Sequence, residues 1–401
     1  MYFELIAAFF GTLFFSMLFS CHRKFLFLSG LNGLIAWFIY LFTLKNTSSL
    51  VFANFWATAA VVLFAQAISL RRRVPLDVFL IPGIFVLVPG ATIYKMFFAF
   101  ISHQDKLAIQ AFKETISIGF SIAMAIFIFV FVFEKLNKAA LKQMSAKALA
   151  CPDSTGNTCL TAVEIGKLML ENGAETHKVE ETIDMFCHIN GLTKVQSFVI
   201  PTGIFVTFLE RKNHPVTELV RIFRRGLNLG RIAEIVEALN SYYAERICYS
   251  DFLLWLREIK SRVYYKKIEM CFAAAFAVAS FSVLFKGNWH ELSISFAVGF
   301  FAQFFIDKMA DFEFPAQLIN IMASAFICFA SYCAARYCTH CRPDILITSS
   351  VMLLVPGVTI INALREIIAG DLVSGSARGF EALIVAASIA SGVGVMLKIL
   401  N

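Results

Sequence analysis

The sequence predicts an all-α polytopic membrane protein with about ten transmembrane helices, arranged as two inverted five-helix halves with an α+β cytoplasmic domain inserted between them. Three observations lead to this fold class. The 401 residues are 59% hydrophobic and 16% charged, a composition typical of a polytopic membrane protein. Long apolar runs fill both ends of the chain, whereas a more charged stretch occupies the middle. A short motif that interrupts one apolar run occurs again at the corresponding place in the other half.

The repeated motif reads Leu-Val-Pro-Gly-x-Thr-Ile, at residues 87–93 and again at residues 354–360. Proline removes a backbone donor and glycine relaxes the chain, so each copy predicts a break in a helix. Inside a bilayer a broken helix persists only where protein or a watery cavity satisfies the freed backbone groups. Two broken helices in corresponding halves point to the binding site of a secondary transporter. The alternative is a pair of proline kinks that shape the packing and bind nothing.

Residues 1–140 are the first predicted membrane domain. A helix that crosses the hydrocarbon core needs about 20 mostly apolar residues. Runs of this kind cover residues 2–20, 26–44, 49–70, 76–101 and 112–133. The positive-inside rule places the amino terminus outside, because basic residues gather after the first, third and fifth runs. These residues are Arg23, Lys24, Arg71, Arg72, Arg73, Lys135, Lys138, Lys142 and Lys147.

Residues 148–265 are the predicted cytoplasmic domain, because charges become frequent there and long apolar runs disappear. Helices are expected at 158–170, from a cap at Thr176 to about 190, and at about 230–246 and 250–265. The runs 194–200 and 203–210 predict a β hairpin with a Pro-Thr-Gly turn, and residues 219–224 predict a third strand.

Residues 266–401 are the second predicted membrane domain. Its apolar runs cover residues 269–286, 291–306, 317–335, 344–368 and 380–399. Basic residues just before the first run place its start in the cytoplasm. Counting spans then makes the fourth helix of each half cross in opposite directions. The two Pro-Gly helices are therefore expected to be related by an axis in the membrane plane.

The breaks supply most of the candidate site residues. Each break frees backbone amides of the half-helix that follows, and these amides favour an anion together with the helix dipole. Thr92 and Thr359 lie in the first turn beyond the breaks, and Lys95 and Asn362 share their faces three residues later. The candidate substrate-binding residues are Pro89, Gly90, Thr92, Tyr94, Lys95, Pro356, Gly357, Thr359, Asn362, Arg365 and Glu366.

Charged residues farther from the breaks have alternative interpretations. Arg365 lies near the membrane interface, where a basic residue can simply be an anchor. Glu366 is a candidate proton carrier or partner of a substrate ammonium group. Asp77 and Asp344 begin the two broken spans at matched positions, where the alternative is helix capping.

The charges near the breaks favour a substrate with two carboxylates over a zwitterion. Two sets of amides are available, and Lys95 adds a cation with access to the same cavity. An ammonium group would need an acidic partner, and Glu366 lies near the interface rather than deep in the membrane. Backbone carbonyls released by the breaks are the alternative partner for an ammonium group.

Two clusters have residue types that suit a metal ion, and neither leads us to expect one. One cluster shares a face of the helix after Thr176, but apolar residues lie opposite, as on any amphipathic surface helix. The other is a cysteine pair without a second pair of ligands. The clusters are His177, Glu181, Asp184 and His188, and Cys338 with Cys341.

The chain resembles the threonine/serine exporter family. Over about residues 155–400 the resemblance is nearly continuous. It rests on Asn172-Gly-Ala-Glu-Thr176 with Val179-Glu180, Leu354-Val-Pro-Gly357, Asn362-Ala-x-Arg-Glu366, Gly370-Asp371 and Gly375-x-Ala-Arg378. The resemblance makes Glu175 and Glu180 further candidates.

Residues 1–140 resemble the smaller membrane component of the same family, mainly through residues 75–94. Many bacteria encode the two components as separate subunits, and one such pair is assigned to succinate export. The resemblance therefore implies a fusion with the smaller component first. Single-chain amino-acid exporters of the family place the soluble domain first, so this chain differs from them in order.

The expected function is secondary-active, proton-coupled export of a small carboxylate, either a succinate-like dicarboxylate or threonine/serine. It is expected to work by alternating access across the cell (inner) membrane. No P-loop motif occurs, so ATP is not the expected drive. No cofactor or metal is expected. No nucleic-acid partner is expected either, because much of the net charge of +7 lies at the ends of apolar runs. The sequence does not decide whether the protein forms a homo-oligomer. The alternative function is a membrane-anchored enzyme or sensor that acts through residues 148–265.

Overall fold

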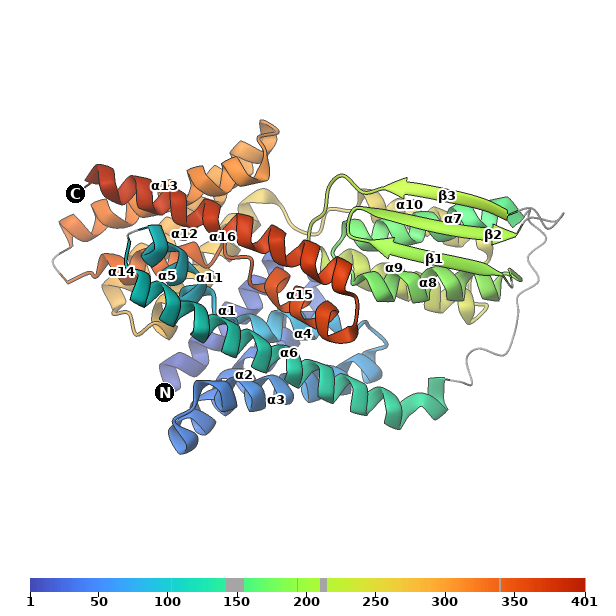
Figure 1. Cartoon of the computed structure of the whole chain (residues 1–401), viewed down its shortest axis with the longest axis horizontal. Helices are drawn as coiled ribbons and strands as arrows, with labels where there is room; N and C mark the ends of the chain where they lie inside the picture. The colour runs from blue at the N-terminus through green and yellow to red at the C-terminus, as the bar shows by residue number, and fades with distance from the viewer. Residues whose placement is uncertain (102, 142–154, 193, 210–214, 339, 401) are drawn as a thin grey trace.

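The computed structural model describes residues 1–101, 103–141, 155–192, 194–209, 215–338 and 340–400. The protein is mostly helical and has two parts (Figure 1). Long helices from both ends of the chain form one part, and a three-stranded sheet backed by helices forms the other. Lys142, Lys147 and the last position of the predicted strand 203–210 lie outside the described residues.

The first half of the helical part follows the predicted apolar runs. Its helices are α1 (Tyr2–Leu18), α2 (Leu26–Thr47), α3 (Leu50–Arg72), α4 (Asp77–Phe85), α5 (Gly90–Ile101) and α6 (Asp105–Leu141), with a short 3-10 turn η1 (Arg23–Phe25) after α1. The fourth run is broken at the Pro-Gly motif as predicted, and α4 and α5 meet at an angle of 54°. Helix α6 extends beyond the predicted run at both ends because polar residues continue its helical turns.

The second half has the same succession of elements. Its helices are α11 (Lys267–Leu284), α12 (Trp289–Asp311), α13 (Ala316–Tyr337), α14 (Pro343–Val351), α15 (Gly357–Ala369) and α16 (Leu372–Leu400). Helix α12 begins with a capping box. The Asn288 side chain accepts from the Glu291 amide, and the Glu291 side chain accepts from the Asn288 amide. The second Pro-Gly motif separates α14 from α15.

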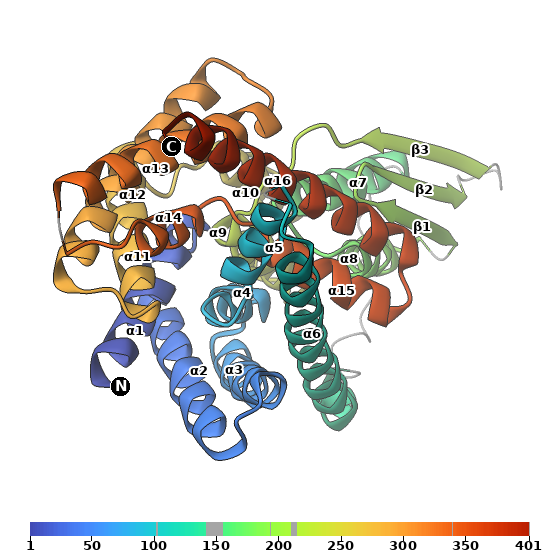
Figure 2. The same cartoon turned by 60° about the vertical axis from the view of Figure 1, so that its left-hand side comes forward.

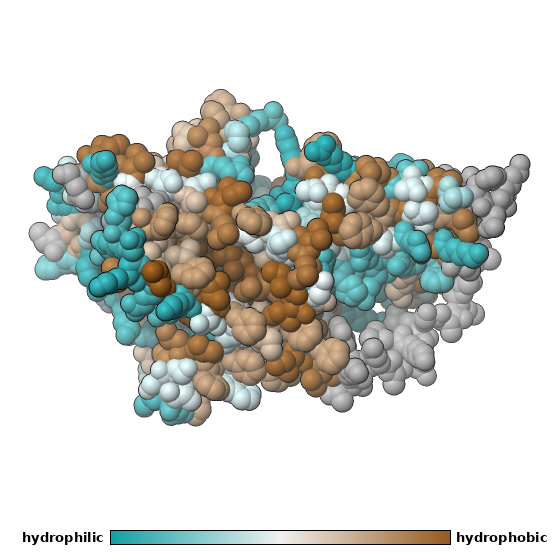
Figure 3. Space-filling view, viewed as in Figure 1, coloured by the Kyte–Doolittle hydropathy of each residue, from teal (hydrophilic) through white to brown (hydrophobic). Residues whose placement is uncertain are grey.

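Among the described residues, seven helices are long and apolar enough to cross a membrane, and the bent α4–α5 pair makes an eighth. They are α2 with η1, α3, α6, α11, α12, α13 and α16. Helix α1 is apolar but has 17 residues, and α14 and α15 are separate helices of 9 and 13 residues. Figure 3 shows hydrophobic side chains over the middle of this part and mostly hydrophilic ones over the other. The chain is therefore a multi-pass membrane protein.

Corresponding helices make corresponding contacts in the two halves. In the first half α1 packs on α2, α2 on α3, α3 on α6 and α5 on α6. In the second half α11 packs on α12, α12 on α13, α13 on α16 and α15 on α16. Across the halves α1 packs on α11, α6 on α15, and α5 on α16 (Figure 2).

The middle part is a two-layer α/β unit. Its helices are α7 (Thr155–Glu171), α8 (Thr176–Ile189), α9 (Leu229–Tyr243) and α10 (Tyr249–Ser261), and its strands are β1 (Val195–Ile200), β2 (Gly203–Leu209) and β3 (Pro215–Arg221). The predicted hairpin is confirmed, with Ile200 opposite Gly203 in an antiparallel pair. The third strand starts earlier than predicted and pairs antiparallel with β2. The helices cover one face of the sheet, with Phe186, Tyr242 and Phe252 stacked in the core between them.

The prediction that Thr176 caps α8 is wrong. Glu175 is the N-cap residue, its side chain makes no capping bond, and Thr176 is the first residue of the helix. The side chains of both residues face the membrane helices instead, as described below.

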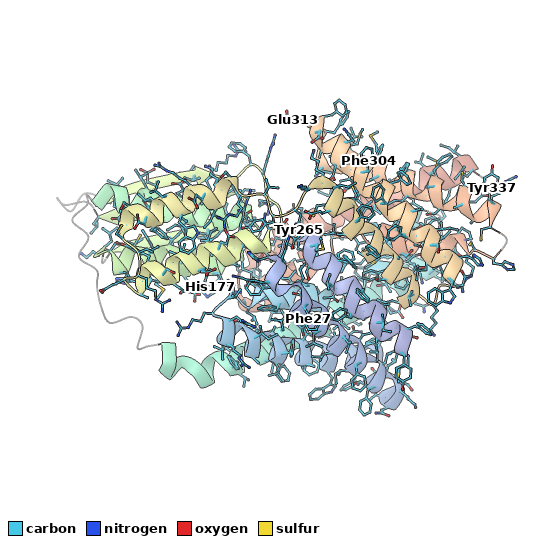
Figure 4. The ribbon with its side chains drawn as sticks, turned by 180° about the vertical axis from the view of Figure 1, so that it is seen from behind. Phe27, His177, Tyr265, Phe304, Glu313 and Tyr337 are labelled. Atoms are coloured by element: carbon cyan, nitrogen blue, oxygen red, sulfur yellow. The ribbon has the colours of Figure 1, made fainter. Side chains whose placement is uncertain are left out.

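The α/β unit is attached to the membrane helices by backbone contacts at the end of α1. The amides of Leu229 and Gly230 donate to the carbonyls of Phe19 and Ser20, at 2.9 and 3.1 Å. A Cβ at Gly230 would lie 2.5 Å from the Ser20 oxygen, so this close approach requires glycine. Tyr265, which lies between the two parts in Figure 4, donates to the Cys21 carbonyl at 2.5 Å. These bonds fix which end of the membrane helices the α/β unit covers.

Candidate functional site

The two Pro-Gly breaks have the same hydrogen-bond scheme. The amide of Gly90 donates to the Val88 carbonyl at 2.7 Å, and that of Gly357 to the Val355 carbonyl at 2.8 Å. The half-helix then starts with a bond to the proline carbonyl, at 3.0 Å in the first break and 3.1 Å in the second. Two amides in each break have no backbone acceptor among the described residues: those of Ala91, Thr92, Val358 and Thr359. Each break therefore leaves donors available to an anion.

The breaks also touch each other, and the contact is reciprocal. A Cβ on Gly357 would overlap Cγ1 of Val88, and a Cβ on Gly90 would lie 3.1 Å from Cγ1 of Val355 and 2.7 Å from Sδ of Met352. Val88 and Val355 hold the same place in the motif, so each valine packs on the glycine of the other copy. The contact explains why both copies need glycine, which has no Cβ to occupy this space.

The predicted residues of the first break are largely engaged elsewhere. Thr92 Oγ1 donates to the Pro89 carbonyl at 2.8 Å and accepts from Thr115 of α6 at 2.9 Å. Tyr94 is buried and stacks on Phe98. Lys95 is exposed on the surface of α5. The structure does not bring Lys95 together with the other candidates, and its part in a substrate cavity stays a prediction.

The predicted residues of the second break are closer to a cavity. Asn362 is 4% exposed, and its Oδ1 atom has no hydrogen-bond partner among the described groups. Thr359 is half-buried one turn earlier. Both line a pocket of about 200 Å³ between α15, α16 and the α/β unit. Asp344, the counterpart of Asp77, is exposed at the far end of α14 and does not join the site.

Charged residues from three distant segments meet where α8 reaches the membrane helices. Lys178 Nζ lies 2.7 Å from Asp77 Oδ2, and Arg365 Nη1 lies 2.6 Å from Glu175 Oε1. Lys178 is also 3.6 Å from Glu175, and Arg365 is 4.0 Å from Asp77. The four side chains form a closed ring of ion pairs, hereafter the four-charge ring. It joins the start of α4, the start of α8 and the last turns of α15.

A second group of polar contacts adjoins the four-charge ring. Arg378 Nε lies 3.0 Å from Glu366 Oε2, and its Nη2 donates to the Ala174 carbonyl at 3.1 Å. Thr176 Oγ1 donates to Asp371 Oδ2 at 2.8 Å and lies 3.4 Å from Glu366 Oε1. These contacts connect α8 to the end of α15 and the start of α16. Both groups therefore hold the α/β unit against the same end of the two broken helices.

The four-charge ring shifts the pKa values of its members outside the membrane helices. Burial alone would raise the pKa of Glu175, but Arg365, Lys178 and Arg378 outweigh it and lower that pKa to about 2. Burial alone would lower the pKa of Lys178, but Asp77 and Glu175 raise it above its ordinary value. Glu175 and Lys178 therefore both carry their charges at neutral pH.

The remaining candidates of the α/β unit have local partners. Glu180 accepts from the Val199 amide at 2.8 Å, and burial raises the pKa of its carboxyl. Asp184 accepts from Ser197 at 2.8 Å, and His177 lies 3.2 Å from Glu181. Among the described residues, no group of three or more histidine, cysteine or acidic side chains is arranged to hold a metal ion.

Sequence reasoning missed several residues of this cluster as site residues. Lys178 lies three residues after Glu175, a spacing that places both on one side of α8. Arg378 and Asp371 belong to the motifs that carry the family resemblance, yet their contacts with Glu366 and Thr176 could be known only from the fold. The sequence predicts a cap at Thr176, because a threonine before a helical run is usually an N-cap residue.

The fold and the site together define a multi-pass membrane protein in which two broken helices meet next to an α/β unit. Residues 160–400 match the family described as "Putative threonine/serine exporter", and residues 4–132 match the one described as "Threonine/Serine exporter, ThrE". The chain belongs to the threonine/serine exporter family. The two matches follow one another along the chain, consistent with a fusion of two parts of the family, the smaller one first.

Curated relatives match the second part of the chain. The protein named "Probable succinate transporter subunit YjjP" of Klebsiella aerogenes is 24% identical over 237 residues, which is 59% of this chain and 90% of the relative. The protein of the same name from Escherichia coli is 24% identical over 247 residues, covering 59% and 91%. "Uncharacterized protein C7D4.12c" of Schizosaccharomyces pombe is 22% identical over 249 residues, covering 58% and 32%. No solved structure matches the chain.

Proposed function

We propose that the protein is a secondary-active exporter of a small carboxylate, with the two Pro-Gly breaks as the centre of its transport path. The observation that carries this proposal is the reciprocal contact of the breaks, with unpaired amides on both sides of it. Broken helices that meet at mid-depth are a recurrent way to build a substrate site in transporters. A packing kink would not require a matched pair of breaks in mutual contact.

Family and relatives support the substrate class. The family description names threonine and serine, and the printed name of two relatives refers to succinate. Succinate, threonine and serine share a carboxylate, and an unpaired amide at a helix start is a carboxylate donor. The proposed substrates are therefore a succinate-like dicarboxylate or threonine and serine.

Alternating access is proposed to occur between two inverted halves of five spans each. The matched contacts within the halves and the exchanged contacts α6–α15 and α5–α16 support this arrangement. In this arrangement α1 and the α14–α15 pair complete ten spans. The α/β unit faces the cytoplasm, and the membrane is the cell (inner) membrane. Glu366, beside Arg378 at the end of α15, is the proposed proton-carrying group.

The four-charge ring supports a proposal about which side is closed in this conformation. Asp77 belongs to the first broken helix and Arg365 to the second, and both are held by α8. Separation of the two helix ends on the α/β side would have to break these ion pairs. We propose that the described conformation is closed on the α/β side and that opening releases α8.

Counterflow into liposomes tests the function. Purified protein in vesicles preloaded with unlabelled succinate or L-threonine should accumulate the labelled compound from outside. The alternative, a membrane-anchored enzyme or sensor acting through the α/β unit, would release a product or nothing, without moving label. Accumulation of no amino acid or dicarboxylate in a panel of both classes would contradict the exporter proposal.

A further inference from the structure

We propose that the α/β unit forms one wall of a carboxylate-binding pocket, so that it takes part in substrate binding and is not solely an attachment to the membrane helices. The inference rests on the proposed export function and names a place where the substrate binds. The pocket, of about 200 Å³, lies between the α/β unit and the first turns of α15. Gly173, Arg225, Gly226 and Leu227 come from the α/β unit, and Val358, Thr359, Asn362, Arg378 and Glu381 from the membrane helices.

An unpaired buried acceptor supports the proposal that a polar ligand occupies the pocket. Asn362 is 96% buried, because its exposed fraction is 4%, and its Oδ1 atom has no hydrogen-bond partner among the described groups. An unsatisfied buried amide oxygen costs about 1–3 kcal/mol. Because Oδ1 is an acceptor, a donor of the ligand, such as a hydroxyl or an ammonium group, or a water molecule would remove that cost.

The groups around Asn362 are those that bind a carboxylate. The amides of Val358 and Thr359 lack backbone acceptors at the start of α15, and Thr359 adds a hydroxyl. Arg378 is 7% exposed and contributes a guanidinium group. Backbone amides at a helix start, together with arginine, are the usual partners of a carboxylate.

The α/β unit contributes charge as well as shape. Arg225 Nη2 lies 2.8 Å from Glu381 Oε2, so the unit reaches across the pocket mouth to α16. Each arginine of the pocket is paired with a glutamate, Arg225 with Glu381 and Arg378 with Glu366. The pocket therefore offers both cationic and anionic groups, and its ligand is a small carboxylate that can carry a second polar group.

Gly226 allows the pocket to be filled without disturbing the fold. A Cβ on Gly226 would meet no atom within 4 Å. The backbone amide of Gly226 donates a hydrogen bond to the Glu171 carbonyl, and this bond does not depend on the side chain. A tryptophan at Gly226 would therefore project into open space at the pocket. Gly379 is the matched control, because a Cβ there also meets nothing and Gly379 does not line the pocket.

The test measures binding of radiolabelled succinate and of L-threonine to the purified full chain in detergent. Gly226→Trp should weaken binding of the compound that the unaltered protein binds by about tenfold or more, whereas Gly379→Trp should change it by less than about twofold. Equal binding by both variants would overturn the proposal that this pocket binds the substrate. The two compounds also distinguish a dicarboxylate ligand from an amino acid.

A second variant keeps the test valid if Gly226→Trp fails to fold. Gly226→Cys in a background without native cysteines should bind like its parent, and should lose binding after reaction with a bulky methanethiosulfonate. Excess unlabelled substrate should slow that reaction at Gly226→Cys and not at Gly379→Cys. Full binding after complete modification would overturn the inference.

The failure of this inference can be distinguished from failure of the proposed function. If counterflow by the unaltered protein persists in Gly226→Trp, the pocket is wrong and the exporter proposal stands. If the unaltered protein binds a carboxylate at this pocket and moves none across the liposome membrane, the pocket stands and the exporter proposal is wrong.

Discussion

Glu175 and Arg365 form an ion pair of 2.6 Å between the N-cap of α8 and the last turns of α15. Both side chains are largely buried, with exposed fractions of 17% and 11%. Arg365 also lies 4.0 Å from Asp77 at the start of α4. One arginine thus stands between two carboxylates, one on the α/β unit and one on the other broken helix.

Arg365→Gln should destabilise the protein more than Glu175→Gln. Loss of the arginine leaves two buried carboxylates with Lys178 as their nearest cation, whereas loss of Glu175 leaves Arg365 near Asp77. Breaking a buried pair by removing one partner typically costs about 3–5 kcal/mol. Thermal unfolding of the full chain in detergent would measure the difference.

The control is Arg224→Gln, which breaks an ion pair with Glu313 on the surface. These side chains are 88% and 77% exposed, so this substitution should leave the melting temperature almost unchanged. Equal melting temperatures for Arg365→Gln and Arg224→Gln would show that the four-charge ring does not stabilise the structure.

The contribution of Glu175 to stability should depend on pH in the acidic range. Its pKa is lowered from 4.5 to about 2, so its contribution is complete above pH 4.5 and is lost as the pH falls towards 2. The pKa of Lys178 is raised above 10.5, so its contribution is complete below 10.5 and is lost at higher pH. The melting-temperature difference between wild type and Glu175→Gln should be constant from about pH 5.5 to 9 and shrink below about pH 4. A difference that disappears near pH 6 would be inconsistent with this assignment.

The two glycines of the breaks should differ in their tolerance of alanine. At Gly90 the nearest atoms are the flexible end of Met352, whereas at Gly357 the overlapping atom is Cγ1 of the stiffer Val88. Gly357→Ala should therefore cost about 1–3 kcal/mol and reduce transport more than Gly90→Ala. Val88→Ala should restore part of the loss in Gly357→Ala, because it removes the overlapping methyl group. Absence of any rescue would show that the contact does not explain the effect.

Replacement of both break residues should impair transport without preventing insertion. Pro89→Ala with Gly90→Ala, or Pro356→Ala with Gly357→Ala, favours a continuous helix that has no free amides at mid-depth. Counterflow should fall in both double variants while the protein is still recovered from the membrane fraction. Normal counterflow in both double variants would show that the breaks serve packing and not transport.

Lys95 and Asn362 hold matched positions but should respond differently to substitution. Asn362 is buried beside the pocket and Lys95 is exposed. Asn362→Leu should reduce uptake of the transported carboxylate about tenfold, the effect of losing one to two hydrogen bonds. Lys95→Gln should have less than about a twofold effect. A selective loss of succinate relative to threonine uptake in Lys95→Gln would instead support the two-carboxylate site that its sequence position predicts.

The proposed orientation can be tested by cysteine accessibility in intact cells, in a background depleted of native cysteines. Asn46, in the last turn of α2, should be outside, and His188, on the α/β unit, should be inside; both side chains are exposed. An impermeant thiol reagent should label Asn46→Cys and spare His188→Cys until the cells are permeabilised. Labelling of His188→Cys in intact cells would place the α/β unit outside and reverse the proposed direction of access.

The sequence by itself determined the features that depend on local chemistry. Apolar runs such as residues 26–44 form helices because their backbone groups are satisfied within one segment. The breaks at Pro89 and Pro356 follow from proline's missing amide hydrogen. The hairpin around Pro201 follows from turn residues between two β-prone runs. Each of these features involves neighbours in the chain.

Only the tertiary structure decided which distant groups meet. Asp77, Lys178, Glu175 and Arg365 form one ring because α8 docks on the ends of both broken helices, a relationship with no local signal in the sequence. Burial likewise separated Asn362 from Lys95, although the motif gives them equivalent positions. The physical reason is that burial and ion pairing depend on atoms contributed by other segments, whereas helix formation and helix breaking depend on the segment itself.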